Sequence, residues 1–262
     1  MSQFRLHNRS ILALALIALS CVPEEPRPIF DDQGEEIPVP DPGELWLRIQ
    51  SVEPTEDLST RPAIAITFNQ YIDPSTFISF SAARLASGGL SYGGNATYRM
   101  TRRQVIFYPH ASLEPDLTYR LEWTADDVES ISGSPYLREP RAPRFRVRDD
   151  LDVDPAPSRP QVTWQQVEEI FDAHCNYCHG SDRWHHLPAL TPASLIGRPS
   201  SQVDAPLVAP TQPTRSYLMH KILPDYPLRR FTVQPPPWSD AEPLSLEQIE
   251  QIEDWIANGA PH

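Results

Sequence analysis

Two cysteines and a histidine stand close together in the segment Cys175-Asn176-Tyr177-Cys178-His179. Two thiols separated by two residues can reach the two vinyl groups on one edge of a porphyrin and form thioether bonds with them. The residue after the second thiol then lies under the iron, where a histidine imidazole can coordinate it. The spacing therefore predicts one covalent haem c, attached at Cys175 and Cys178, with His179 as the proximal iron ligand.

Other chemistry is open to the same residues but is supported less well. A structural zinc ion would take Cys175, Cys178 and two of His179, His185 and His186, yet these histidines are closely spaced and no second cysteine pair exists. A thioredoxin-like redox pair is expected in a βαβ context, which the surrounding sequence lacks. The short loop between the two cysteines disfavours an inert disulfide.

A helix is predicted immediately before this segment, and it would deliver the chain into the two cysteines. Thr163 and Gln166 form a capping-box pattern, which marks a helix start. Residues at i, i+3, i+4 and i+7 then give one amphipathic face: Val167, Ile170, Phe171 and His174.

Two further helices are expected in the same part of the chain. Ser245 and Gln248 repeat the capping-box pattern, and Gly259 is a natural residue to follow the end of that helix. The apolar face of this last helix would consist of Leu246, Ile249, Ile252 and Ile256. A shorter helix is predicted around residues 216–223. Three helices joined by proline-rich loops can enclose one flat cofactor.

Residues 162–262 resemble a small bacterial cytochrome c domain over nearly their whole length. Three places carry the resemblance: Val167-x-x-Ile170-Phe171 before the cysteines, Pro213-x-x-Ser216-x-Leu218-x-x-Lys221-Ile222, and Trp255-Ile256-x-x-Gly259-Ala260. The resemblance implies an all-α fold, electron transfer through one haem, and a methionine as the second axial ligand of the iron.

The second axial ligand is where this sequence departs from that family. Similar domains have a Met-Pro pair shortly before the last helix, but Gln234 stands at the matching place here. The only methionine after the attachment motif is Met219, for which core packing is an equally good explanation. Met219 and Gln234 therefore stay as alternative distal ligands, ahead of His185, His186 and His220. Met219 predicts a relatively high potential, whereas Gln234 or an open position predicts weakly ligated iron that small molecules can bind.

Residues 47–148 predict an all-β sandwich, because short strand-like runs alternate with turn signals such as Gly88-Gly89. The runs are residues 45–50, 63–68, 96–100, 104–108, 119–123 and 144–148. The stretch resembles a bacterial Ig-like domain of the surface-layer type. That resemblance is carried by Ile66-Thr67-Phe68-Asn69 with Ile72-Asp73-Pro74, and by Leu113-Glu114-Pro115 leading into Tyr119-Arg120-Leu121. Residues 149–161 form a proline-rich linker, and its composition suggests that the two domains need not pack together.

The first 20 residues are expected to be a signal peptide. Arg5 and Arg9 precede an apolar run over residues 11–19, which is much shorter than the roughly 20 residues that a membrane span needs. Ala18-Leu19-Ser20-Cys21 resembles a bacterial lipobox, which implies lipidation of Cys21. Val22 in the next position favours the outer membrane over the inner one. Residues 21–46, rich in proline and acids, would then be an extended tether.

These features together predict an exported protein on the periplasmic or cell-surface side, held to a membrane by lipid. We expect an electron carrier rather than an enzyme, with an unidentified redox protein as partner. The missing Met-Pro pair keeps open a haem enzyme or sensor, peroxidase-like or gas-binding. A surface interaction protein that acts through its Ig-like domain is the third possibility. The net charge of −13 argues against nucleic acid as a partner, since phosphate binding needs concentrated basic charge.

Overall fold

The computed structural model describes residues 29–30, 36–37, 46–76, 83–123, 128–137, 142–152, 159–176, 178–180, 187–239 and 241–262. The chain divides into two units, Met1–Asp41 and Pro42–His262. In the first unit, β1 (Ile29–Phe30) pairs antiparallel with β2 (Glu36–Ile37). Cys21 and the predicted signal peptide lie outside the described residues.

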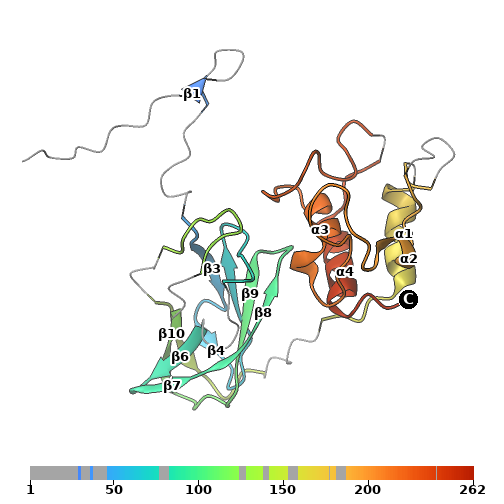
Figure 1. Ribbon diagram of the computed structural model, residues 1–262. Helices are drawn as coiled ribbons and strands as arrows, with labels where there is room; N and C mark the ends of the chain where they lie inside the picture. The colour runs from blue at the N-terminus through green and yellow to red at the C-terminus, as the bar shows by residue number, and fades with distance from the viewer. Residues whose placement is uncertain are drawn as a thin grey trace, which may run out of the picture. The chain divides into compact units, whose positions relative to one another are not determined.

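Two antiparallel sheets dominate residues 47–147 (Figure 1). The first has the order β3 (Ile49–Glu53), β5 (Ile64–Phe68), β9 (Gln104–Pro109) and β8 (Gly94–Arg99). The second has the order β4 (Asp57–Leu58), β11 (Arg144–Val147), β10 (Thr118–Trp123), β6 (Ala83–Ser87) and β7 (Leu90–Tyr92), with only β4 and β11 running parallel.

Alternation of buried and exposed residues explains why these segments form facing sheets. In β5 the buried side chains are Ile64, Ile66 and Phe68, and in β11 they are Phe145 and Val147. Both sets join one buried cluster with residues of the other strands, as expected when two sheets pack face to face. The all-β prediction for this part of the chain is therefore confirmed.

In the described part of residues 159–262, the regular secondary structure consists of helices. They are α1 (Trp164–His174), α2 (Pro192–Leu195), the 3-10 helix η2 (Pro213–Arg215), α3 (Tyr217–Ile222) and α4 (Leu246–Ala257). The helices are few and mostly short, and long loops join them. No helix among the described residues is both long enough and apolar enough to cross a membrane.

The two predicted capping boxes are present in the structure. The Thr163 side chain accepts from the Gln166 N–H and the Ser245 side chain accepts from the Gln248 N–H, with the reciprocal bond made in each case. Gly259 follows the C-cap of α4 with a φ of +95°, a conformation that favours glycine. Buried side chains of α1 and α4 share one cluster, which includes Phe171 of α1.

The sandwich and the helices also pack against each other within the unit Pro42–His262. Tyr71 and Met100 of the sandwich belong to the buried cluster of the helices, and Tyr71 Oη donates to Asp225 Oδ1 at 2.7 Å. The linker composition suggested otherwise. The physical reason for the difference is that the end of the linker is itself part of the contact, since Arg159 pairs with Glu253 of α4 at 3.2 Å.

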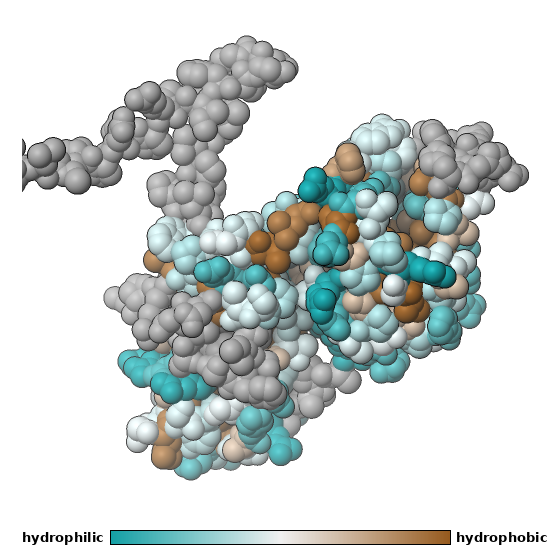
Figure 2. All heavy atoms as spheres, in the orientation of Figure 1, coloured by the Kyte–Doolittle hydropathy of each residue, from teal (hydrophilic) through white to brown (hydrophobic). Residues whose placement is uncertain are grey.

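Exposed hydrophobic side chains are scattered over the surface on the face drawn in Figure 2, where hydrophobic residues alternate with hydrophilic ones. Phe231 is 80% exposed and Trp238 is 74% exposed, the highest values for phenylalanine and tryptophan among the described residues, and both lie in the loop between α3 and α4. Single exposed apolar residues are ordinary on a protein surface.

Candidate functional site

The predicted attachment residues lie on a turn at the end of α1. Cys175 is the C-cap of α1, and its N–H donates to the Phe171 carbonyl at 2.8 Å. The N–H groups of Cys178 and His179 both donate to the Cys175 carbonyl, at 3.1 and 3.0 Å. The structure therefore brings Cys175, Cys178 and His179 together in one turn, as the sequence spacing led us to expect.

Both cysteines are half-buried free thiols. Burial raises the pKa of the Cys175 thiol from 9.0 to about 12, and the neighbouring Cys178 adds to the rise. Reactive redox cysteines instead have a lowered pKa, because the thiolate is the nucleophile. The electrostatics of Cys175 thus disfavour a thioredoxin-like redox pair.

One hydrogen bond fixes the imidazole of His179. Its Nδ1 lies 3.1 Å from the carbonyl oxygen of Pro188, and because a carbonyl can only accept, Nδ1 must carry the proton. Burial lowers the pKa of His179, partly offset by this hydrogen bond. The ring is therefore neutral near pH 7, with Nε2 left as the lone-pair nitrogen, which is the form that binds metals.

Gly180 makes the contact between His179 and Pro188 possible. Its φ is +73°, and a Cβ at this position would lie 2.9 Å from the Cβ of Ala189. Its N–H donates to the Leu187 carbonyl at 3.1 Å. The segment 187–189 can approach His179 closely only because residue 180 has no side chain. Sequence analysis missed Gly180 and Pro188. The glycine directly after the motif was an available signal, whereas nothing local marks the carbonyl of Pro188.

The two candidate distal ligands lie in different environments. Met219, on α3, is fully buried in the hydrophobic cluster shared by α1, α3 and α4. Gln234 is half-buried in the loop before α4, and its N–H donates to the Lys221 carbonyl at 2.8 Å. The side-chain amide of Gln234 makes no hydrogen bond with any residue that the structure describes.

Lys221 holds the loop that carries Gln234. Its Nζ donates to the carbonyls of Arg230 and Thr232, at 2.9 and 2.8 Å, in addition to the backbone bond just described. Burial lowers the pKa of Lys221, and the charge of Arg229 lowers it further. Three hydrogen bonds with Lys221 thus hold the loop before Gln234 against α3.

Of the remaining histidine candidates, His220 lies among the described residues. His220 is buried, its Nε2 lies 3.0 Å from the Thr214 carbonyl, and its ring stacks on Tyr226 with centroids 4.3 Å apart. That nitrogen is therefore already engaged. His185 and His186 lie outside the described residues.

A four-ligand zinc site is not formed by the described residues, among which no group of three His, Cys, Asp or Glu side chains could hold a metal ion. A haem iron needs fewer protein ligands, so this observation does not bear on it. The chemistry of the site fits a c-type haem in two respects. It offers two free thiols in one turn, and it offers a neutral imidazole whose Nε2 makes no hydrogen bond with the described residues.

The solved structures that resemble this chain cover less than half of it. None of the curated proteins matches this chain. The S-layer protein rSbsC(31-844) has 14% sequence identity and a TM-score of 0.31, over 45% of this chain and 15% of that one. The N-terminal part of the bacterial S-layer protein SbsC has 12% identity and a TM-score of 0.31, over 46% and 27%. The LD transpeptidase LdtMt1 in complex with imipenem has 13% identity and a TM-score of 0.27, over 38% and 39%.

A family model described as bacterial Ig-like domain matches residues 47–147. These bounds agree with the two sheets and with the buried cluster between them. This chain spans only 15% and 27% of the lengths of the two S-layer structures. Residues 47–147 form a bacterial Ig-like domain.

Proposed function

We propose that this chain is an exported c-type cytochrome that binds one covalent haem and transfers electrons. The observation that carries the proposal is the arrangement at the end of α1, where two free thiols and a histidine share one turn. The Nδ1–H of that histidine is tied to the Pro188 carbonyl, so Nε2 is the nitrogen left for iron.

The two cysteines and the histidine of the turn would have different roles in binding the haem. Cys175 and Cys178 hold the haem through thioether bonds, and His179 is the proximal ligand. The hydrogen bond to Pro188 fixes the tautomer and orientation of the imidazole and increases the basicity of Nε2. A bound haem supplies a centre that accepts and releases one electron, and its potential follows from the axial ligands and from burial.

Covalent attachment is the direct test. The chain would be produced in cells that attach haem to exported proteins, and haem would be detected by peroxidase stain after denaturing electrophoresis. The wild type should stain, Cys175→Ala and Cys178→Ala should each lose most of the stain, and Cys21→Ser should keep it. A wild-type chain that is exported intact but never stains would overturn the proposal.

A haem enzyme or gas sensor is the second candidate, and two observations favour it. Met219 is fully enclosed in the hydrophobic cluster, which supports a packing role for its side chain. Gln234, the other candidate, is a weak iron ligand. Visible spectra of the ferrous protein with and without carbon monoxide separate the two functions. A spectrum that shifts with carbon monoxide supports ligand binding, and an unmoved six-coordinate spectrum supports electron transfer alone.

We further propose that the protein lies on the periplasmic or cell-surface side, anchored by lipid at Cys21. Bacterial Ig-like domains suggest an extracellular or surface protein, and the family match covers residues 47–147. The attachment to the outer membrane in particular rests on the sequence around Cys21 and Val22. Radiolabelled palmitate should enter the wild type and should not enter Cys21→Ser.

A further inference from the structure

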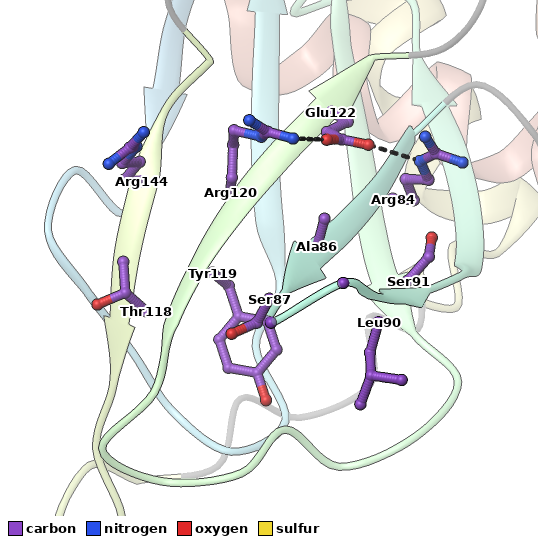
Figure 3. Close-up of a pocket in the computed structure, with 12 residues that line it drawn as sticks. Arg84, Ala86, Ser87, Leu90, Ser91, Thr118, Tyr119, Arg120, Glu122 and Arg144 are labelled. Atoms are coloured by element: carbon purple, nitrogen blue, oxygen red, sulfur yellow. Dashed lines mark hydrogen bonds and ion pairs between the residues drawn. The ribbon is translucent and has the colours of Figure 1, made fainter.

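A pocket lies on the outer face of the Ig-like domain, on the five-stranded sheet and at the turn between β6 and β7 (Figure 3). Its lining includes the arginines Arg84, Arg120 and Arg144, together with the single acid Glu122. The roles proposed for Cys175, Cys178 and His179 make no use of this pocket.

Strand register explains why the pocket exists. Ser91 of β7 is opposite Ala86 of β6, Ala86 is opposite Arg120 of β10, and Arg120 is opposite Arg144 of β11. Directly opposed residues point to the same face of a sheet, so these four side chains form one row across four strands. Ala86 contributes only a methyl group near the middle of the row. The sheet face is therefore hollowed between the serine and the two arginines.

The charges in the pocket are unbalanced. Glu122 accepts from Arg84 Nε at 2.7 Å and also pairs with Arg120, and these two arginines lower the pKa of its carboxyl. Arg144 makes no hydrogen bond or ion pair with the residues that the structure describes, and in Figure 3 no dashed line reaches it. Three guanidinium groups thus face one carboxylate.

Two arginines directly opposite each other on neighbouring strands repel, which destabilises a sheet. Arg120 and Arg144 are such a pair, and only Arg120 is compensated by an acid. An arginine fork binds carboxylate or phosphate with two parallel hydrogen bonds. The exposed guanidinium of Arg144, beside that of Arg120, is suited to bind an anionic group of this kind.

The rest of the lining indicates what carries the anion. On the same face as the two arginines, Ser91 and Thr118 offer hydroxyl groups, Glu122 can accept a hydrogen bond, and Ala86 presents its methyl group. Hydroxyls, an acceptor and a small apolar surface match a polyhydroxylated ring. We propose that this pocket binds an acidic sugar unit of a polysaccharide, with the sugar carboxylate held by Arg120 and Arg144.

Binding of defined sugars to the purified full chain tests this inference. Tetragalacturonate is the acidic probe, maltotetraose is the neutral probe of the same size, and inorganic phosphate is the anion without a ring. We expect titrations followed by NMR or calorimetry to show binding of tetragalacturonate only. Arg144→Gln should weaken that binding by about ten-fold or more, because it removes a charged hydrogen-bonding partner.

Arg146→Gln is the matched control. Arg146 lies two residues along β11, on the same face, but it pairs with Asp116 at 2.8 Å and does not line the pocket. Its replacement should change the affinity by less than about two-fold, because it contributes no contact to the ligand. Arg144→Lys, which keeps the charge without the fork, should bind with intermediate affinity, and melting temperatures of all variants establish that they fold.

Three results would overturn the inference: no binding of tetragalacturonate, equal affinities of wild type and Arg144→Gln, or equal binding of tetragalacturonate and inorganic phosphate. The last result would mean an anion site without sugar recognition. None of these measurements depends on haem, so failure here and failure of the proposed electron transfer are distinguishable.

Discussion

At the residue scale, the site depends on how closely the segment 187–189 approaches His179. Gly180 permits that approach in two ways, through its positive φ and through the absence of a Cβ. Gly197 has a similar φ, +66°, but a Cβ there would meet nothing within 4 Å. Comparing these two glycines therefore separates the backbone effect from the contact with Ala189.

We predict that Gly180→Ala destabilises the protein by about 2–3 kcal/mol, since the backbone strain costs about 1 kcal/mol and the overpacking against Ala189 adds about 1–2 kcal/mol. Gly197→Ala should cost only about 1 kcal/mol, because it carries the backbone strain alone. Urea denaturation measures both values. Equal losses for the two variants would mean that the contact with Ala189 is unimportant.

The thiol of Cys175 gives a prediction about pH. Its folded pKa of about 12 lies above its ordinary 9.0, so the folded state keeps the thiol protonated through the range where an exposed thiol ionises. At pH 8 the thiolate population is lower in the folded chain than in the unfolded one by about three orders of magnitude, one for each unit by which the two pKa values differ. Folding thus protects Cys175 from alkylation.

Alkylation of the haem-free protein by iodoacetamide, followed by peptide mapping, measures this protection. The rate at Cys175 should be low at pH 8 and should rise about ten-fold per pH unit up to about pH 12, as expected for a thiolate nucleophile. The urea-unfolded chain provides the reference. Modification of Cys175 as rapid in the folded chain as in urea would contradict the prediction.

At the element scale, α4 depends on its N-terminal cap and on a link to α1. The Ser245 side chain accepts from the Gln248 N–H at 3.2 Å. The Gln248 side chain lies 2.9 Å from Nε2 of His174, and Nδ1 of His174 lies 2.8 Å from the Glu242 carbonyl. The start of α4 and the end of α1, where the attachment turn begins, are therefore held together by one short chain of hydrogen bonds.

Ser245→Ala should destabilise the protein by about 1 kcal/mol, because one N–H at the start of α4 loses its partner. Ser201→Ala is the control, since Ser201 is exposed in a loop and should change stability by less than about 0.5 kcal/mol. Thermal or urea unfolding gives both values. A Ser245→Ala variant as stable as the control would show that the cap contributes nothing.

Local patterns account for the elements that sequence analysis predicted correctly. Capping boxes and helical spacing lie within a few residues, so α1 and α4 were found at their starts. The strand-like run over residues 63–68 correctly predicted β5. The strands β4, β6 and β7 were not predicted, because β4 and β7 are two and three residues long and β6, with the sequence Ala-Arg-Leu-Ala-Ser, has little β-propensity.

In the candidate site, too, the local motif was predictable from the sequence and the distant contact was not. The motif places Cys175, Cys178 and His179 by covalent spacing alone, and the structure brings them together. The partner of His179 is a backbone carbonyl nine residues away, and every residue has a carbonyl, so no side-chain pattern could indicate Pro188. The relation of the helices to a cytochrome c fold, and the choice between Met219 and Gln234, stay predictions.

At the scale of the whole molecule, buried charges join the Ig-like domain to α4. Glu253 is 1% exposed, and its carboxylate accepts from the N–H groups of Met100 and Thr101 at 3.0 and 2.9 Å and pairs with Arg159. Asp254 beside it pairs with Arg99 at 2.7 Å and with Arg159 at 2.9 Å. Since breaking a buried pair leaves charges and N–H groups without partners, these contacts couple the two parts energetically.

The wild type should therefore unfold in a single cooperative transition that includes the sandwich and the helices. Glu253→Ala should destabilise the protein by about 3 kcal/mol, since it leaves two buried N–H groups unpaired and reduces the pairing of Arg159. Glu250→Ala, one turn earlier in α4, removes only the pair with Arg102, whose side chain is 52% exposed, and should cost less than about 1 kcal/mol.

Differential scanning calorimetry with circular dichroism at wavelengths for strand and helix measures both effects. We expect Glu253→Ala to separate the transition into two, with the helices unfolding first, because this change removes the carboxylate that accepts from the β8–β9 turn. Two transitions already present in the wild type would mean that the Ig-like domain and the helices fold independently. The position of the attachment turn relative to the sandwich would then be free rather than fixed by these buried charges.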